Sequence, residues 1–250
     1  MTTHAVDAAP LRRWDELAVG LAGAAAGSSG IVLLYREPAA VAWVQVLLLA
    51  ALLARWHRRA DLAGLLVGAA LGNLTEFLMD VAGVWVHHNR DVAGVSPLYI
   101  FICYPILLLA LPRLLNPLVG QPRPLMEGSG RAAAVALLLW AAHVGASFLW
   151  GTRNAPEAAA CVVILGLVLW QFHSAHDVAS ALFGAVLALV WELPATATGA
   201  WHFPAPQVLG LVPAWLPLAY AIFFVTLGRI TAWLCALRWV RGDATPAAGC

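Results

Sequence analysis

The sequence contains no lysine and few charged residues of any kind. Charged residues make up 11% of its 250 residues, and all 14 basic residues are arginines. Hydrophobic residues make up 62%, and the mean hydropathy is +0.82. Soluble domains carry about 25% charged residues, so this composition excludes a soluble globular domain and predicts an integral membrane protein. The net charge of +1 favours no nucleic-acid partner.

Other absences narrow the class of protein further. The cysteines lack the spacing of metal ligands or of a disulfide framework, and Cys103, Cys161 and Cys235 lie in apolar runs as small apolar side chains. The chain has no phosphate-binding loop and no aspartate-rich diphosphate site, which disfavours a prenyltransferase. The polar N-terminus has no signal-peptide cleavage site, so we expect it to be retained. We expect no cofactor and no bound metal.

Apolar runs long enough to cross a membrane recur along the whole chain. A membrane-spanning helix needs about 20 predominantly apolar residues. Eight candidate spans meet this requirement, some of them short: 17–35, 39–56, 62–86, 97–116, 133–151, 156–172, 178–201 and 212–236. The sequence therefore predicts an all-α polytopic membrane bundle.

The arginines are distributed unevenly between the two sides of this bundle. With eight spans, eleven arginines fall on one side, and only Arg36, Arg90 and Arg153 fall on the other. Because arginine-rich loops stay in the cytoplasm, we expect both termini there and the protein in the cell membrane.

The most specific feature of the sequence is an internal repeat. A shift of 116 residues places 57–113 over 173–229 without a gap. The matched pairs include Asp61 and Asp177, Gly68 and Gly184, Glu76 and Glu192, Gly83 and Gly199, Trp85 and Trp201, Gly94 and Gly210, Pro97 and Pro213, Tyr104 and Tyr220, and Arg113 and Arg229. Four spans per unit is an even number, so both units insert the same way up and form a tandem parallel repeat.

This repeat divides the chain into two four-helix units. The predicted units are 17–116 and 132–236, joined by a cytoplasmic linker at 117–131 that is rich in proline and glycine. Residues 1–16 and 237–250 are predicted to be cytoplasmic terminal segments.

Two glutamates lie at matching depth in the third and seventh spans. At about 1.5 Å per residue, Glu76 lies roughly 22 Å from the cytoplasmic end of its span, and Glu192 lies at the equivalent place. Asp80 follows Glu76 by four residues, on the same helix face. An ionisable side chain at this depth indicates a functional site. If the two glutamates are close together, one is expected to be protonated, which would create an acid and base pair.

A central histidine and several aromatic residues complete the candidate site. His143 lies near mid-depth in the fifth span, either bonded to a backbone carbonyl or as a partner of Glu192 or Asp80. The aromatic candidates are packing residues, membrane-interface residues, or cavity-lining residues that stabilise a cation through their ring faces. These aromatic residues are Trp85, Trp201, Tyr104, Tyr220 and Trp191.

The pattern of Glu, Gly-x-Trp, Gly, Pro and an "LPLAYA" segment resembles small membrane enzymes that act on prenyl chains. These are the carotenoid cyclases and hydratases and the terpene cyclases of meroterpenoid pathways. The resemblance covers the third, fourth, seventh and eighth spans, and it implies that Glu76 and Glu192 are proton donors.

The leading hypothesis is an enzyme that carries out acid-initiated cyclisation, hydration or isomerisation of a lipophilic isoprenoid within the bilayer. Glu192 or Glu76 would donate the proton, Asp80 or the other glutamate would accept one, and His143 would tune them. The alternatives are a proton-coupled small-solute transporter, a His-ligated membrane oxidase or hydroxylase, and a non-catalytic assembly factor. The expected partners are a lipophilic small molecule and membrane lipid.

Overall fold

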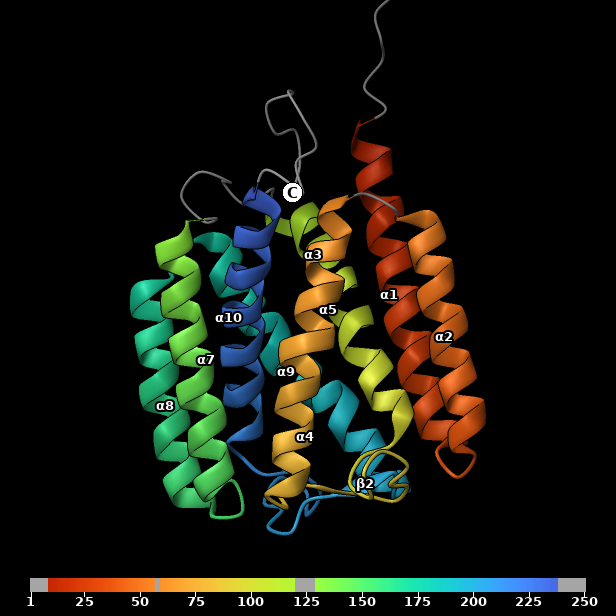
Figure 1. The fold of residues 1–250 in the computed structure, drawn as a ribbon, viewed down its shortest axis with the longest axis vertical. Helices are drawn as coiled ribbons and strands as arrows, with labels where there is room; N and C mark the ends of the chain where they lie inside the picture. Colours follow the sequence, from red (N-terminus) through yellow and green to blue (C-terminus); the bar gives the residue numbers. More distant parts are fainter. Residues whose placement is uncertain (1–8, 57–58, 120–128, 238–250) are drawn as a thin grey trace, which may run out of the picture.

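Eight helices of the protein are long and apolar enough to cross a membrane, in a computed structural model that describes residues 9–56, 59–119 and 129–237 (Figure 1). The predicted all-α polytopic bundle is confirmed. The elements are α1 (Ala9–Leu34), α2 (Pro38–Arg55), α3 (Arg59–Val67), η1 (Gly68–Gly72), α4 (Asn73–Val81), β1 (Val86–His87), α5 (Leu98–Val119), α7 (Gly130–Trp150), α8 (Asn154–Gln171), α9 (Ala175–Thr198), β2 (Trp201–His202) and α10 (Leu216–Ala236).

Side-chain and backbone signals set the helix ends. Ser129 caps α7 by accepting a hydrogen bond from the Ala132 amide. Ser174 and Asp177 form a capping box at the start of α9. The same helix ends at Gly199, whose φ of 85° lies in the left-handed region that glycine adopts without strain. In the third span, α3, the π-helical turn η1 and α4 follow one another without a break.

The tandem repeat is present in the backbone as well as in the sequence. The 116-residue shift carries the bounds of α2 onto those of α8. It also carries unusual backbone conformations onto each other, because positive φ angles occur at Ala93 and at its counterpart Leu209. Short bridges in the two long loops match in the same way, Val92 with Ser96 and Val208 with Val212. The fold is therefore built from two copies of one four-helix unit.

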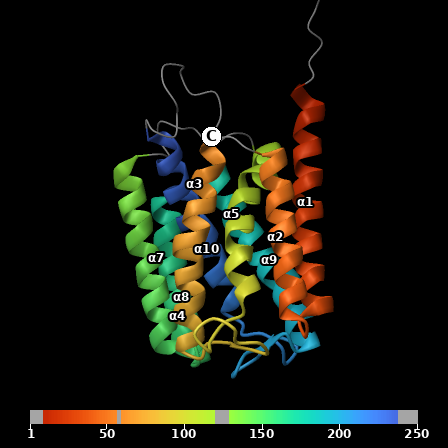
Figure 2. The ribbon, with the colours of Figure 1, turned by 45° about the vertical axis from the view of Figure 1, so that its right-hand side comes forward.

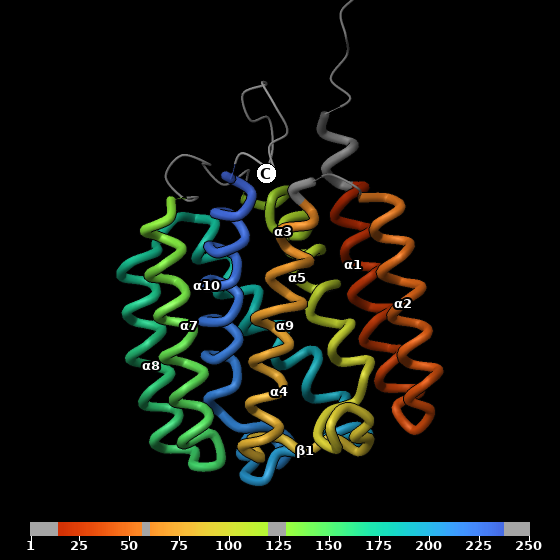
Figure 3. The backbone as a smooth tube through the Cα atoms, in the orientation of Figure 1, coloured from red at the N-terminus to blue at the C-terminus, as the bar shows by residue number. Residues whose placement is uncertain are grey.

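The two units share a central layer of spans (Figures 1 and 2). This layer consists of the third span, α5, α9 and α10, and the pairs α1–α2 and α7–α8 flank it on either side (Figure 3). In the most apolar 18-residue stretch of α5 and of α10, 67% is buried within the protein, whereas the corresponding share in α2 and in α8 is 22%. The core therefore lies between the units, and the flanking pairs present most of their surface outward.

A short antiparallel ribbon joins the units at one side of the bundle. Val86 of β1 pairs with His202 of β2, and His87 pairs with Trp201. His202 is the counterpart of Val86 in the 116-residue repeat, and the two residues pair with each other. A residue that pairs with its own counterpart lies next to the axis that relates the two units, so this axis passes through the ribbon. We call this the loop side and the opposite side, where α1 begins and α10 ends, the terminus side (Figure 1).

Each unit has a buried ion pair near the terminus side. Arg113 pairs with Asp61, and Arg229 pairs with Asp177. The guanidinium carbons of Arg113 and Arg229 each lie 4.9 Å from the centre of an aromatic ring, that of Trp56 and that of Phe172 respectively. Most of the predicted linker and terminal segments lies outside the described residues, so the predicted domain bounds stay predictions.

A glycine in each unit brings two central helices into close contact. A Cβ atom on Gly68 would lie 2.5 Å from the Tyr104 carbonyl oxygen, and one on Gly184 would lie 2.6 Å from the Tyr220 carbonyl oxygen. Such distances are too short for any side chain, so only glycine lets the helices approach this closely. The approach places each tyrosine beside the helix that carries the glutamate.

Candidate functional site

Each glutamate is held by a tryptophan and a tyrosine of its own unit. Trp85 Nε1 donates to Glu76 Oε1 over 3.0 Å, and the Tyr104 hydroxyl donates to Glu76 Oε2 over 2.7 Å. In the second unit, Trp201 Nε1 donates to Glu192 Oε2 over 2.6 Å, and the Tyr220 hydroxyl donates to Glu192 Oε1. The duplicated sequence pattern therefore builds the same carboxylate cradle twice.

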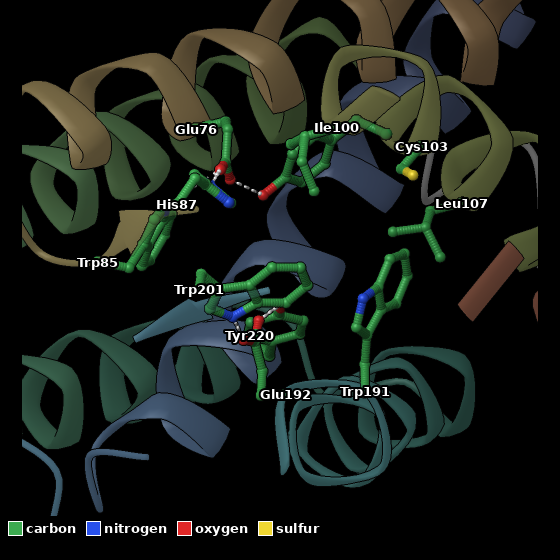
Figure 4. Close-up of a pocket in the computed structure, with 11 residues that line it drawn as sticks. Glu76, Trp85, His87, Ile100, Cys103, Leu107, Trp191, Glu192, Trp201 and Tyr220 are labelled. Atoms are coloured by element: carbon green, nitrogen blue, oxygen red, sulfur yellow. Dashed lines mark hydrogen bonds and ion pairs between the residues drawn. The ribbon is translucent and has the colours of Figure 1, made fainter. Parts of the chain in front are cut away.

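The two cradles face a single pocket. Glu76 and Glu192 lie on opposite sides of it, and the two residues are only 4% and 6% exposed (Figure 4). The free space is about 410 Å³, including the pocket's open mouth. The lining residues are Glu76, Trp85, His87, Ile100, Cys103, Tyr104, Leu107, Trp191, Glu192, Trp201 and Tyr220.

The first unit adds a polar cluster that the second unit lacks. His87 Nε2 lies 2.7 Å from Glu76 Oε1 and 3.4 Å from Asp80 Oδ1. The Ser96 hydroxyl donates to Asp80 Oδ2. The positions equivalent to Asp80, His87 and Ser96 in the second unit are Thr196, Phe203 and Val212. Glu76 is therefore part of a larger hydrogen-bond network than Glu192.

A second, mainly apolar pocket adjoins the first. The two share Trp85, Tyr104, Leu107 and Tyr220 in their walls. The free space of the second pocket is about 510 Å³, including its mouth. Its other lining residues are Thr75, Met79, His143, Val144, Ser147, Trp215, Leu216, Ala219, Phe223 and Phe224. Together the pockets offer a polar end with two carboxylates and an apolar end.

Most of the residues predicted for the site lie together. Glu76, Glu192 and the five predicted aromatic residues, Trp85, Trp201, Tyr104, Tyr220 and Trp191, all line the first pocket. Asp80 joins them through His87. His143 lines the adjoining apolar pocket, with Nδ1 3.5 Å from the Ser147 hydroxyl, and among the described residues no hydrogen bond or ion pair links it to Glu192 or Asp80. The predicted functional roles of these residues stay predictions.

His87 belongs to the site but was not predicted to do so. His87 follows Trp85 at the end of the predicted third span, and this position alone does not distinguish a residue of the site from one at the membrane interface. The sequence did contain a signal for this cluster. At Asp80, His87 and Ser96 the first unit has a different residue from the second unit, and these three side chains contact one another in the fold.

The arrangement favours binding of a hydrogen-bond donor. An indole N–H can only donate, so Trp85 and Trp201 require an acceptor oxygen on each glutamate. Both oxygens of each glutamate already accept from the protein. A carboxylate held in this way still has lone-pair sites for a further donor, but it is poorly arranged to release a proton to a substrate.

The chain was compared with known protein families and solved structures. A family model described as a domain of unknown function (DUF6989) matches residues 33–150. The chain is similar in structure to a mycobacterial Insig homolog, MvINS from Mycobacterium vanbaalenii, with a TM-score of 0.56 and 22% identity. The match covers 72% of this chain and 95% of the other. At this identity the likeness establishes the shared fold, and no curated protein matches the sequence.

These findings correct two expectations. The predicted resemblance to prenyl-chain cyclases and hydratases is wrong, because the solved structure that shares the fold is an Insig homolog. The predicted acid-initiated isoprenoid chemistry, and the alternatives of a proton-coupled transporter or a His-ligated oxidase, are overturned by the same match. The geometry agrees, since each candidate metal cluster among the described residues contains one histidine. The expectation of some enzymatic activity stays a prediction.

Proposed function

We propose that the protein binds a lipophilic molecule between its two units and that binding, rather than chemistry on the ligand, is its function. The ligand's polar end would lie between Glu76 and Glu192, and its apolar part would occupy the adjoining pocket. The observation that carries this proposal is that two carboxylates line opposite sides of one buried pocket whose walls continue into an apolar one.

The chemistry of the walls favours a ligand with a hydroxyl or amino group. Carboxylate oxygens accept hydrogen bonds and repel anions. In the part of the chain that the structure describes, His87 Nδ1 of the pocket lining has no hydrogen-bond partner, and Asp80 Oδ1, outside the lining, has only its 3.4 Å contact with His87 Nε2. Unsatisfied buried polar atoms are costly, so a ligand or water that reaches them is favoured. A free fatty acid fits poorly, because its carboxylate would face Glu76 and Glu192.

The fold match supports a binding role only in general terms. An Insig homolog shares the architecture, and the pocket lies between the units, where helical membrane folds commonly hold their ligands. The ligand class proposed here comes from the pocket lining.

Binding can be tested with two probes that differ in a single donor. Hexadecan-1-ol has a hydroxyl hydrogen, whereas its methyl ether does not. We expect the alcohol to displace a brominated long-chain alcohol that quenches pocket tryptophans in the purified protein, and the ether and palmitate to be weaker competitors. Glu192→Gln should weaken alcohol binding roughly tenfold or more, because a hydrogen bond to a charged group is worth about 1.5–3 kcal/mol.

Glu37→Gln is the matched control, because Glu37 is exposed beside the start of α2, away from the pocket lining. Equal competition by the alcohol and the ether, with no effect of Glu76→Gln or Glu192→Gln, would contradict the proposal.

The arginine distribution supports cytoplasmic termini in a cell membrane. Arg36, Arg90 and Arg153 belong to loop-side connections, whereas Arg55, Arg113, Arg131 and Arg229 lie toward the terminus side. Reporter fusions to either terminus should therefore give cytoplasmic signals, and an external signal from both would reverse the orientation.

A further inference from the structure

A second polar cluster lies between α7 and α8, in the flanking pair of the second unit. It contains His143 and Ser147 of α7 and Glu157 and Cys161 of α8. The Cys161 sulfur lies 3.4 Å from Glu157 Oε1, which also accepts a hydrogen bond from Ser147 over 2.5 Å. One ligand-type atom from each of His143, Glu157 and Cys161 lies within 4.8 Å of the other two.

The cluster is fully buried and its carboxylate is incompletely satisfied. Glu157 is 0% exposed and Cys161 is 0% exposed. Glu157 Oε2 has no hydrogen-bond partner among residues 9–56, 59–119 and 129–237. Glu157 Oε1 accepts from a hydroxyl and a thiol, both uncharged. A carboxylate buried in a membrane span without a cationic partner is costly.

We propose that His143, Glu157 and Cys161 bind a divalent transition-metal ion of the Zn²⁺ type. The charges balance on binding: the Cys161 thiol releases its proton to solvent, and thiolate, carboxylate and M²⁺ sum to zero while the imidazole stays neutral. A neutral assembly suits a site surrounded by hydrocarbon. The ion would also satisfy the unpartnered Glu157 oxygen.

The donor set selects the class of metal. A nitrogen, a sulfur and an oxygen ligand together are typical of zinc, whereas calcium and magnesium take oxygen ligands almost alone. Bonds of about 2.0–2.3 Å in a tetrahedron place the ligand atoms roughly 3.5 Å apart. The Cys161 sulfur already lies 3.4 Å from Glu157 Oε1, and the other ligand separations are at most 4.8 Å, so binding needs the ligands to move closer by about 1 Å at most. The neighbouring Ser147 hydroxyl or a water molecule can complete the tetrahedron.

The first unit provides an internal comparison. The positions equivalent to His143, Glu157 and Cys161 are Gly27, Val41 and Gln45. There, Gln45 Nε2 donates to the Gly27 carbonyl oxygen over 3.0 Å and ties the two helices together directly. The same place between two flanking helices thus holds an amide contact in one unit and three potential metal ligands in the other. We infer that the metal has the same clamping role for α7 and α8.

The location also permits entry of an ion. Glu157 is the fourth residue of α8, and Ser147 lies three residues before the end of α7. At about 1.5 Å per residue both are within about 5 Å of the loop-side turn that joins the helices, and His143 and Cys161 are each about 10 Å from it. An ion can therefore reach the cluster without crossing the bilayer.

Cobalt is the probe that separates this site from other clusters. Glu76, Asp80 and His87 also lie within 4.8 Å of one another, but they include no sulfur and belong to the ligand pocket. A thiolate bound to Co²⁺ gives an intense near-ultraviolet charge-transfer band, which an oxygen and nitrogen site cannot produce. We expect one equivalent of Co²⁺ to produce this band in the purified full chain and Zn²⁺ to abolish it.

Two matched variants assign the band to one sulfur. A chain with Cys103, Cys235 and Cys250 replaced by serine should keep the band, whereas Cys161→Ser in the otherwise native chain should lose it. Glu157→Gln and His143→Gln should each weaken Co²⁺ binding by tenfold or more. Zinc content by mass spectrometry should fall from about one per chain to near zero in Cys161→Ser.

Folding is followed separately by size-exclusion chromatography and by the response of thermal unfolding to zinc. Zinc should raise the unfolding temperature of the native chain and leave that of Cys161→Ser unchanged. No charge-transfer band in a well-folded native chain, or an undiminished band in Cys161→Ser, would overturn the proposal. Neither result would decide lipid binding, which is measured by tryptophan quenching. Because His143 and Ser147 also line the apolar pocket, Cys161→Ser, outside that lining, is the variant that separates the two proposals.

Discussion

The two units of the protein have the same structural contacts, which we call the frame, and they differ in their buried polar clusters. Both keep the arginine–aspartate pair near the terminus side, the glycine at the close helix contact, and the glutamate held by tryptophan and tyrosine. The first unit alone has the Asp80, His87 and Ser96 network. The second unit alone has the His143, Glu157 and Cys161 cluster.

This comparison separates architecture from specialisation. The shared residues make the same contacts twice, so they belong to the structure common to both units. The two clusters occupy different places within the unit, one at the pocket and the other between flanking helices. A duplicated frame therefore supports two different additions without loss of its symmetry.

The largest expected effect comes from breaking the frame. Arg229→Met leaves Asp177 buried without its cation, and Arg113→Met does the same to Asp61. Removing one partner of a buried ion pair costs about 3–5 kcal/mol. We expect both variants to show a large fall in thermal unfolding temperature in detergent and a loss of monodisperse protein.

The control removes both charges of one pair. Asp177→Asn combined with Arg229→Met leaves no unpaired charge, so it should recover most of the stability lost in Arg229→Met. If Arg113→Met proves harmless while Arg229→Met does not, the ion pairs are not equivalent parts of a duplicated frame.

The frame was predictable because it rests on long signals. Eight apolar runs, an even number per unit, and identical polar residues at one offset predict the helices and the repeat without tertiary information. The same offset placed Glu76, Glu192 and their aromatic neighbours at one depth, which is where the pocket lies. Helix ends lie within five residues of the predicted ones, except that α1 begins at Ala9, eight residues before the predicted start, and capping residues such as Ser174 set some of these ends.

The polar clusters were harder to predict because each depends on contacts across a turn or between helices. His87 reaches Glu76 only because the loop-side ribbon turns it back into the bundle. His143 meets Glu157 through a helical hairpin, although Glu157 and Cys161 are four residues apart and share a helix face. The predicted prenyl chemistry failed because acidic residues in a membrane indicate a site without specifying its reaction.

A smaller effect distinguishes the two carboxylate cradles. Glu192 accepts from Tyr220 and Trp201, whereas Glu76 is contacted by Tyr104, Trp85 and His87. Tyr220→Phe removes one of two contacts and should cost about 1–3 kcal/mol, as for a buried acceptor left short of donors. Tyr104→Phe leaves two contacts and should cost about 0.5–1.5 kcal/mol.

Chemical or thermal unfolding of the two single variants side by side measures this difference, each unit serving as the control for the other. An equal or larger loss in Tyr104→Phe would mean that His87 does not support Glu76 as its 2.7 Å contact implies.

The smallest net change is expected when the first unit is converted to the second at its pocket. Ser96→Val alone removes the hydroxyl that donates to Asp80, and a buried acceptor without its donor costs about 1–3 kcal/mol.

The triple variant Asp80→Thr, His87→Phe and Ser96→Val removes the whole network. It installs the residues that already occupy the equivalent positions of the second unit, Thr196, Phe203 and Val212. Replacing all partners together can be nearly neutral, so the triple variant should be more stable than Ser96→Val. Because Glu76 then loses only His87 and keeps Trp85 and Tyr104, as Glu192 keeps Trp201 and Tyr220, alcohol binding should fall by less than in Glu192→Gln. A triple variant less stable than each of its three single variants would show that Asp80, His87 and Ser96 belong to the frame and are not an addition to it.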